Sequence, residues 1–267
     1  PYVAQDALRK DFPQIEASAH LLAARPVALK DGVATEVDDF KFADGQVFDV
    51  LDLPFLHGDP KVALAKPGDL VLTESEAVRR FGTENPIGQV LTIVARGISA
   101  DYRVTGVLRD LPKNSHLKIS MIGRYDIQSY WAEQPQFLTE YGWQSGWIYV
   151  RLRPGADVAA INSQFQAWEK RNIPDQIING RRTNAGDETD FKLVNVRDVH
   201  LGRAQAGAMT PGNDYRSIAT FMVVALLILG MACVNFVNLA TARASQRARE
   251  VALRKVLGAN RSQLMTQ

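Results

Sequence analysis

The spacing of apolar and polar residues changes character along this chain of 267 residues. Up to about residue 200, apolar residues alternate with polar ones over short stretches, which is typical of strands, or recur every three to four positions, which is typical of amphipathic helices. Separated groups of strands and helices predict an α+β fold. The expected elements are a short helix over 3–11 and strands near 15–24, 37–42, 69–73, 89–95, 102–109, 118–123, 147–152 and 191–196.

Two further helices have start signals in the sequence. Thr73 is followed by Glu76 three residues later, a spacing that predicts a reciprocal capping box, and Gly82 is the expected stop of that helix. Asp157 is the expected N-cap of the second helix. The buried stripe of that second helix is predicted to contain Val158, Ile161, Phe165 and Trp168.

The pattern changes at residue 217. From Ser217 to Ala242 there are 26 consecutive residues without a charge. As a helix they would span roughly 39 Å, which exceeds the ~30 Å hydrocarbon core of a bilayer. Asn235 and Asn238 lie near the end of the run, where an amide costs less or can bond a neighbouring helix. We interpret 217–242 as a transmembrane helix; the alternative, a buried core helix, seldom stays uncharged for so long.

Charge separates the chain into the same parts. The whole chain has 31 Lys and Arg against 29 Asp and Glu, and its net charge of +2 with 46% apolar residues describes an ordinary soluble protein. Residues 1–216 alone carry −3, and residues 243–267, with six basic residues and one acid, carry +5. By the positive-inside rule, 243–267 are cytoplasmic and 1–216 extracytoplasmic. Because the chain begins at Pro1 without an apolar leader, we expect a signal or helix upstream in a longer protein.

Several function classes are disfavoured. The near-neutral charge argues against a nucleic-acid partner, and one Cys excludes an internal disulfide framework or a Cys-based zinc site. The sequence has no GxxxxGK[ST], GxSxG or HExxH motif, so we expect no catalytic residues, cofactor or metal. An anchored extracytoplasmic enzyme stays an alternative that no motif supports. No two of the four histidines have ligand spacing: His20, His57, His116 and His200.

Aromatic residues are concentrated between positions 125 and 149, which hold eight of the 22 in the chain. One interpretation is an interaction surface, with Trp131, Trp143 and Trp147 as its candidates, because Trp and Tyr are enriched at interfaces. The interpretation that we favour is a loop packed on the sheet edge with its rings buried.

The basic tail has an amphipathic pattern. Leu253, Val256 and Leu257 share one helix face, while basic residues occupy the others and Gly258 is the expected stop. Such a helix can lie against anionic membrane lipids or present a rigid element to a cytoplasmic partner, and the pattern favours neither.

Several blocks in order resemble MacB/FtsX-like ABC-transporter permeases. The run NLATARASQRAREVALRKVLGA, within residues 233–264, resembles the segment that follows the second membrane helix of that family. VFDVLDLPFLHGDP, LVLTESEAVRRFGTENPIGQVLTI and YRVTGVLRDLPKNSHLKI, within 47–120, resemble its extracytoplasmic domain. WIYVRLRPGADVAAINSQFQAWEK, within 147–170, resembles a later strand–helix unit of the same domain.

The resemblance implies a particular domain organisation. Residues 1–216 would form a two-lobed extracytoplasmic domain, followed by the transmembrane helix 217–242 and by a cytoplasmic coupling segment that begins at 243–267. A porter-like lobe would comprise 1–45 and 117–205, with an inserted lobe at 46–116. By position, the contacts to an ATPase would be made by Glu250, Arg254, Lys255 and Gly258.

The resemblance also implies a function and its partners. The chain would be part of a permease subunit in the bacterial cytoplasmic (inner) membrane, with its outer domain moving in response to a separate or fused cytoplasmic ABC ATPase. A second copy or a paired permease, membrane lipids and an extracytoplasmic adaptor are the other implied partners. Two alternatives stay open: an FtsX-like interaction protein that regulates a cell-wall hydrolase, and a lipoprotein-releasing permease.

Overall fold

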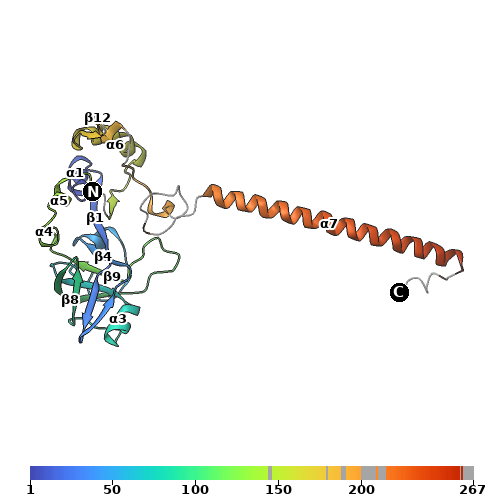
Figure 1. Cartoon of the computed structure of the whole chain (residues 1–267), viewed down its shortest axis with the longest axis horizontal. Coiled ribbons are helices and arrows are strands. Elements are labelled where there is room, and N and C mark those ends of the chain that lie inside the picture. The colour runs from blue at the N-terminus through green and yellow to red at the C-terminus, as the bar shows by residue number, and fades with distance from the viewer. Residues whose placement is uncertain are drawn as a thin grey trace. The chain divides into compact units, whose positions relative to one another are not determined.

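The computed structural model describes residues 1–143, 146–178, 180–187, 191–199, 209, 215–258 and 260. They fall into two compact units, Pro1–Asn195 and Val196–Gln267, which we describe separately. The first unit combines strands with short helices, and the main element of the second is one long helix, α7 (Tyr215–Val256) (Figure 1). The predicted α+β class with a long apolar helix is confirmed.

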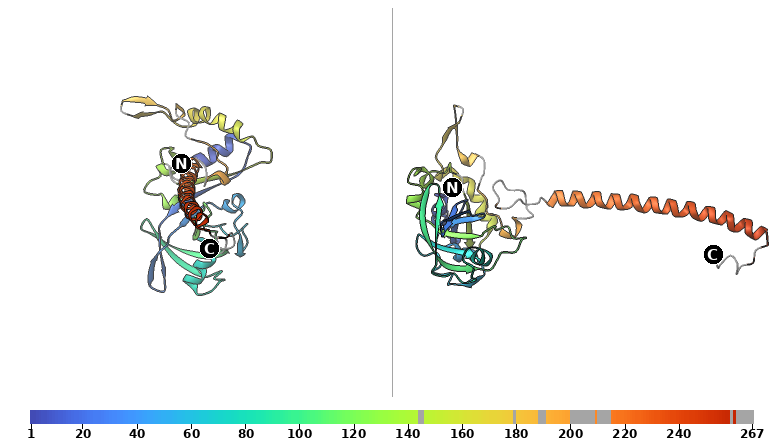
Figure 2. Two further views of the ribbon diagram at one scale, coloured as in Figure 1. Left: turned by 90° about the vertical axis from the view of Figure 1, so that its right-hand side faces the viewer. Right: turned by 60° about the horizontal axis from the view of Figure 1, so that its bottom comes forward.

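The main element of the first unit is a curled mixed sheet of ten strands (Figure 2). Its strands are β1 (Ile15–Ala24), β2 (Val27–Lys30), β3 (Val33–Glu36), β4 (Phe40–Ala43), β5 (Phe55–His57), β6 (Asp69–Thr73), β7 (Val90–Ala95), β8 (Ile98–Leu108), β9 (Met121–Arg124) and β10 (Trp147–Leu152). Their order is β10-β1-β4-β9-β6-β8-β7-β2-β3, with β5 also paired to β8. The pairs β4–β9 and β6–β8 are parallel. A separate hairpin contains β11 (Gln176–Ile178) and β12 (Arg181–Thr183).

Two hairpins of this sheet have two-residue turns with positive φ. Asp31 and Gly32, at φ 51° and 78°, join β2 to β3, and Arg96 and Gly97, at φ 52° and 79°, join β7 to β8. Positive φ at both central residues gives the turn whose twist matches that of paired strands. The alternation of apolar and polar residues in 89–95 and 102–109 predicts the second hairpin. The first was not expected, although the Asp-Gly dipeptide is its recognised signal.

The expected lobes share this sheet. Strand β9 of the expected first lobe pairs with β6 of the 46–116 segment through a ladder from Leu70–Gly123 to Leu72–Met121. The hairpin β2–β3, also from the first lobe, pairs with β7 of the same segment. The division into lobes stays a prediction, and part of it, residues 200–205, lies outside the described residues.

Helix α6 (Val158–Asn172) follows the sequence expectation closely. The carboxylate of Asp157 accepts two first-turn backbone N–H groups at 2.9 and 3.2 Å, so the predicted N-cap is confirmed. Three of the four predicted stripe residues are buried, and only Val158, at the first position, is exposed. The buried ones pack with α1 (Ala4–Asp11) in one hydrophobic cluster that contains Ala4, Leu8, Phe12, Ile15, Ile161, Phe165 and Trp168.

Helix α3 (Glu74–Phe81) begins and ends where predicted, but its predicted capping box is wrong. Gly82 adopts φ 68° and donates its N–H to the Val78 carbonyl at 2.9 Å, which ends the helix. Thr73 occupies the predicted N-cap position, buried at the end of β6, but its side chain makes no cap bond. The carboxylate of Glu76 turns instead to two arginines of the next turn, Arg79 and Arg80.

The predicted strand over 191–196 is also wrong. The Phe191 N–H donates to Glu169 Oε1 at 2.9 Å, and the Leu193 N–H donates to Asn162 Oδ1 at 2.8 Å. The Asn162 side-chain amide returns a bond to the Leu193 carbonyl at 3.1 Å. Side chains of α6 therefore satisfy the backbone groups that a neighbouring strand would otherwise bind.

The short helices complete the first unit. They are α2 (Val47–Val50), α4 (Ile127–Tyr130) and α5 (Gln136–Thr139), with a 3-10 turn at Ala185–Asp187. The larger hydrophobic cluster lies between the sheet and the segment that carries α4 and α5, and it includes Phe40, Phe42, Tyr102, Tyr125, Trp131 and Phe137.

The second unit contains a 3-10 turn (Val196–Asp198) and helix α7. Helix α7 is 42 residues long, and its most apolar window of 18 residues has a mean hydropathy of 2.5 with none of it buried. The helix runs without a break from the uncharged segment 217–242 into the basic segment, as far as Val256. By length and composition, α7 is able to cross a membrane.

Candidate functional site

The four residues expected at the ATPase contact lie at the end of α7. Arg254 Nη2 is 2.5 Å from Glu250 Oε1, an ion pair between residues four apart. Lys255 follows in the last turn, and its carbonyl accepts the N–H of Gly258 at 3.2 Å. Gly258 has φ 92°, a left-handed conformation that favours glycine and ends the helix. Residues 259 and 261–267 of the expected coupling segment lie outside the described residues.

The Glu250–Arg254 pair is exposed, with side-chain accessibilities of 59% and 44%. Exposed pairs of this spacing stabilise a helix by only about 0.3–0.5 kcal/mol. The pair therefore contributes little to folding. Both charges lie exposed near the end of α7.

The aromatic segment is partly core and partly surface. Trp131 is only 6% exposed and stacks on Phe137 with ring centroids 3.7 Å apart. The guanidinium carbon of Arg96, from the β7–β8 turn, lies 4.3 Å from the centroid of the Trp131 ring. Trp131 thus belongs to the core, whereas Trp143 and Trp147 are half-buried and keep part of their surface. The contribution of Arg96 was not expected, because the turn is distant in sequence.

Burial also determines the ionisation of the tyrosines in and beside this segment. Burial raises the pKa of Tyr149 to about 12. It raises the pKa values of Tyr102 and Tyr125 further in the same direction. Burial therefore extends the neutral form of these three phenols, which an unshifted phenol also keeps at physiological pH, further into alkali.

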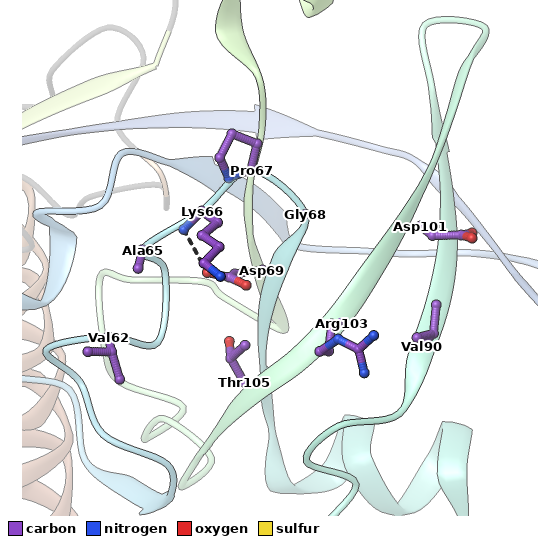
Figure 3. Close-up of a pocket in the computed structure, with 10 residues that line it drawn as sticks. All are labelled: Val62, Ala65, Lys66, Pro67, Gly68, Asp69, Val90, Asp101, Arg103 and Thr105. Atoms are coloured by element: carbon purple, nitrogen blue, oxygen red, sulfur yellow. Dashed lines mark hydrogen bonds between the residues drawn. The ribbon is translucent and has the colours of Figure 1, made fainter.

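A hollow of about 720 Å³ lies beside the loop before β6 and the hairpin β7–β8 (Figure 3). Its charged residues are two cations, Lys66 and Arg103, and two anions, Asp69 and Asp101. Three of these side chains bond to protein groups: Asp69 accepts the Lys66 backbone N–H at 2.7 Å, and Arg103 donates to the Gly88 carbonyl at 2.9 Å. Asp101 accepts the Thr92 hydroxyl at 2.6 Å. Balanced charge and an open shape favour neither an anion nor a cation. Sequence reasoning missed the hollow because its walls meet only through the β6–β8 pairing.

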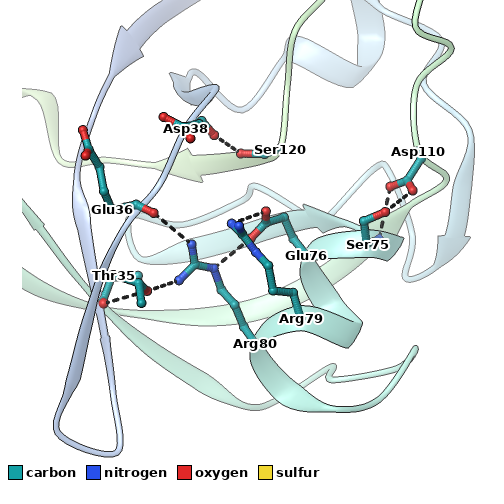
Figure 4. A network of polar contacts seen from close by, with 10 residues as sticks. Thr35, Glu36, Asp38, Ser75, Glu76, Arg79, Arg80, Asp110 and Ser120 are labelled. Carbon is teal, nitrogen blue, oxygen red and sulfur yellow. Dashed lines mark hydrogen bonds and ion pairs between the residues drawn. The ribbon is translucent and has the colours of Figure 1, made fainter.

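A polar network ties α3 to the hairpin β2–β3 (Figure 4). Arg80 bonds Glu76 Oε2 at 2.8 Å and Thr35 Oγ1 at 2.7 Å, and it reaches the Glu36 carbonyl at 3.5 Å. Lys30 Nζ donates to the Arg80 carbonyl at 2.8 Å, at the end of the helix where a cation is favoured. Because these bonds join segments some 45 residues apart, the network fixes the hairpin on the helix.

The possible metal ligands in the described part of the chain are its His, Cys, Asp and Glu side chains. No group of three or more His, Cys, Asp or Glu side chains is placed there to hold a metal ion. His20 lies on β1 and His57 on β5, and His200 falls outside the described residues.

Comparison with known families identifies the domain. The family model of the MacB-like periplasmic core domain matches residues 1–168. The chain belongs to this family. The MacB-like domain is a component of ABC-transporter-type permeases, which are generally not catalytic and work with a cytoplasmic ABC ATPase.

Solved structures similar to this chain include three transporter domains. A domain of a permease protein from Porphyromonas gingivalis has a TM-score of 0.52 and 20% identity, covering 65% of this chain and 71% of its own. The periplasmic region of MacB from Actinobacillus actinomycetemcomitans has a TM-score of 0.48 and 16% identity, covering 74% and 81%. The extracellular domain of the noncanonic ABC-type transporter YknZ from Gram-positive bacteria has a TM-score of 0.39 and 15% identity, and the match covers 62% of this chain and 78% of that domain. At 20% identity the first shows a shared fold only. No curated protein matches the chain significantly.

Proposed function

We propose that this chain is part of a permease subunit in which α7 transmits ATPase-driven movement to the MacB-like outer domain. In this proposal residues 1–216 are extracytoplasmic, α7 crosses the cytoplasmic membrane, and the segment from 243 meets the ATPase. Efflux or another handling of an extracytoplasmic substrate would follow from the movement of the outer domain, with no covalent chemistry in this chain.

The observation that carries the proposal is the continuity of α7. Its 42 residues span roughly 63 Å as an α-helix, about twice the thickness of a hydrocarbon core. The helix contains no proline and a single glycine, Gly230. It therefore forms a rod long enough to join a membrane span to the Glu250–Arg254 pair beyond it.

The sheet of the first unit supports the part of the proposal that concerns movement of the outer domain. The β6–β9 ladder joins the two expected lobes, and the Arg80 network fixes hairpin β2–β3 to α3. A displacement applied to one part of this sheet would therefore be carried to the rest. We expect the outer domain to move as one body.

The proposal includes specific partners. A cytoplasmic ABC ATPase would bind near Glu250, Arg254, Lys255 and Gly258. A second copy or a paired permease would complete the transporter, and lipids would surround α7. The exposed parts of Trp143 and Trp147 are the proposed contact for an extracytoplasmic adaptor, since half-buried Trp side chains are common at interfaces.

The test is ATPase coupling in proteoliposomes that contain the full-length permease and its ATPase. The double variant Glu250→Gln/Arg254→Gln should retain complex formation but lose most of the stimulation of ATP hydrolysis by the permease. A matched control, Glu84→Gln/Arg171→Gln, removes one exposed acid and one exposed base from the first unit and should leave stimulation unchanged.

Unchanged stimulation in the Glu250/Arg254 variant would count against the proposed contact. If the outer domain instead captures a cell-wall hydrolase and no substrate moves, the FtsX-like role would replace the transport role.

A further inference from the structure

The Ser, Thr and Asn residues of α7 lie on one side of the helix, with Gln246 about 20° beyond their arc. At about 100° per residue they fall within an arc of about 120°. They are Ser217, Thr220, Asn235, Asn238, Thr241 and Ser245. The remaining arc, about two thirds of the circumference, carries only apolar side chains between 217 and 242, among them Phe221, Leu229 and Phe236. We call the polar arc the stripe face.

The side-chain amides of Asn235 and Asn238 set the stripe face apart from an ordinary helix surface. Thr220 and Ser245 bond to carbonyls of their own helix, at 2.8 and 3.0 Å. Neither the Asn235 nor the Asn238 side chain makes a hydrogen bond to any residue that the structure describes. Each amide offers a carbonyl acceptor and two N–H donors, which hydrocarbon cannot satisfy. Where neither water nor lipid headgroups reach them, these groups need polar partners from another protein segment.

A groove lies on the same side of α7. It measures about 480 Å³ and is lined by Leu227, Gly230, Val234 and both asparagines, among others. A Cβ placed on Gly230 would meet nothing within 4 Å. The missing side chain thus leaves room for a side chain of a second helix to pack close to the backbone.

The stripe face changes its chemistry where the uncharged segment ends. Beyond Ala242 the same arc carries mainly small and apolar residues, and Leu253 and Val256 on it are 65% and 87% exposed. Arg243, Arg247 and Arg254 point to the other side by the same spacing. In lipid the polar side of a helix is the one that packs on protein, and in water it is the apolar side. Both halves of α7 therefore indicate the same packing side.

Two charges fall on this face, Arg216 at the start of α7 and Arg249 beyond the uncharged segment, and the second indicates the kind of partner. Arg249 lies near the centre of the arc, and the one acid of α7, Glu250, is paired with Arg254. A second, parallel copy of α7 docked through the stripe face would bring Arg249 against Arg249, which is repulsive. We propose that the stripe face packs along a different membrane helix, one that offers hydrogen-bonding groups level with Asn235 and Asn238 and a carboxylate level with Arg249. This inference does not depend on the transport role.

The test is oxygen accessibility of spin labels in the full-length permease with its ATPase in lipid membranes, without ATP. Labels on the native Cys233, and on Leu229→Cys and Phe236→Cys in a Cys233→Ser background, should collide with oxygen several-fold more often than labels on Leu227→Cys and Val234→Cys. Cys233 and Val234 form a matched pair, adjacent in sequence but on different sides of α7. Equal accessibility all round, or the reversed order, would overturn the proposal.

Two further measurements test the partner itself. Oxidation of the Leu227→Cys and Val234→Cys variants should not link two copies of the chain, and an efficient link would show that a second copy occupies the face. Arg249→Glu should raise oxygen accessibility at the Val234 label, whereas Arg249→Lys and the off-face control Arg247→Glu should not. No change with Arg249→Glu would overturn the proposed carboxylate.

Discussion

The first unit and helix α7 place the same residue types in opposite positions. In the sheet unit, Phe40, Phe42 and Phe165 are at most 1% exposed, whereas in α7 Phe221 and Phe236 are 74% and 73% exposed. The sheet unit excludes water from its apolar residues by its own packing. Helix α7 presents them outward, and the Ser, Thr and Asn residues of its uncharged segment lie on one side. The difference indicates that the apolar surface of α7, unlike that of the sheet unit, is completed by surroundings outside the helix, as in a membrane-spanning segment.

Each region also contains polar groups in unfavourable surroundings. Lys41 is 4% exposed in the sheet unit, and burial lowers its pKa although Asp39 lies 3.9 Å away and favours the charged form. The Asp39 carboxylate, from the same unit, thus offsets part of the cost of burying the Lys41 ammonium. The Asn235 and Asn238 amides have no such internal partner among the described residues, which is why they indicate an external one.

The largest expected effect concerns the packed core. Trp168→Ala should lower the free energy of unfolding by about 3–5 kcal/mol, because a fully buried indole and its bond to Asp11 at 2.9 Å are both lost. Chemical denaturation of the chain in detergent, followed by near-ultraviolet circular dichroism, measures it. Ile177→Ala, at a site 79% exposed, should change stability by less than about 0.5 kcal/mol. Equal losses in both variants would contradict the assigned core.

The second prediction concerns the apolar arc of α7. Leu229→Asp should disfavour membrane insertion by about 3 kcal/mol, the typical cost of an acid at the centre of a span. A glycosylation-mapping insertion assay measures the integrated fraction. Ile177→Asp makes the same type of change in the first unit and should leave integration unaffected. Full integration of the Leu229→Asp variant would mean that this side does not face lipid.

The third prediction is a loss of stability in alkali. The pKa of Tyr149 is raised from 10 to about 12 by burial, so the unfolded chain releases this proton first as the pH rises. The stabilising contribution is complete below pH 10 and falls by about 2 kcal/mol as the pH approaches 12. Tyr149→Phe should make unfolding less sensitive to pH in this range. An identical pH dependence in both proteins would refute the assignment.

The smallest effect is expected at the start of α6. Asp157→Ala should cost about 1 kcal/mol, because two backbone N–H groups lose their acceptor. Asp157→Asn keeps an acceptor oxygen and should restore most of the loss. Thermal unfolding of the two variants side by side distinguishes them, and equal destabilisation would show that the cap is not the cause.

Local signals in the sequence predict much of the fold. The strands at 15–24, 69–73 and 147–152 and the Asp157 cap depend on neighbouring residues, and the structure has them where they were expected. The strand at 191–196 failed because α6 side chains bind its backbone, a contact that alternation does not encode. The hollow in Figure 3 and the Arg96–Trp131 contact likewise depend on pairing between distant strands.

The candidate site was harder to predict than the fold. The order of charges places Glu250 and Arg254 four residues apart on a helix, and the structure pairs them. A partner for this pair is not encoded in the order of charges, because the role of an exposed ion pair depends on what it contacts. The aromatic segment shows the opposite limit: composition alone does not separate Trp131, which is buried, from Trp143 and Trp147, which are partly exposed.

The most direct test of transmission through α7 is the distance between outer domains of two copies during ATP binding. A spin label on Ile177→Cys, in a Cys233→Ser background of the full-length transporter in lipid, reports this distance by double electron–electron resonance. We predict that ATP shifts the distance distribution in the otherwise unchanged transporter and leaves it fixed when Glu250→Gln and Arg254→Gln are added. A distribution that does not respond to ATP, in transporters that hydrolyse it, would contradict the account.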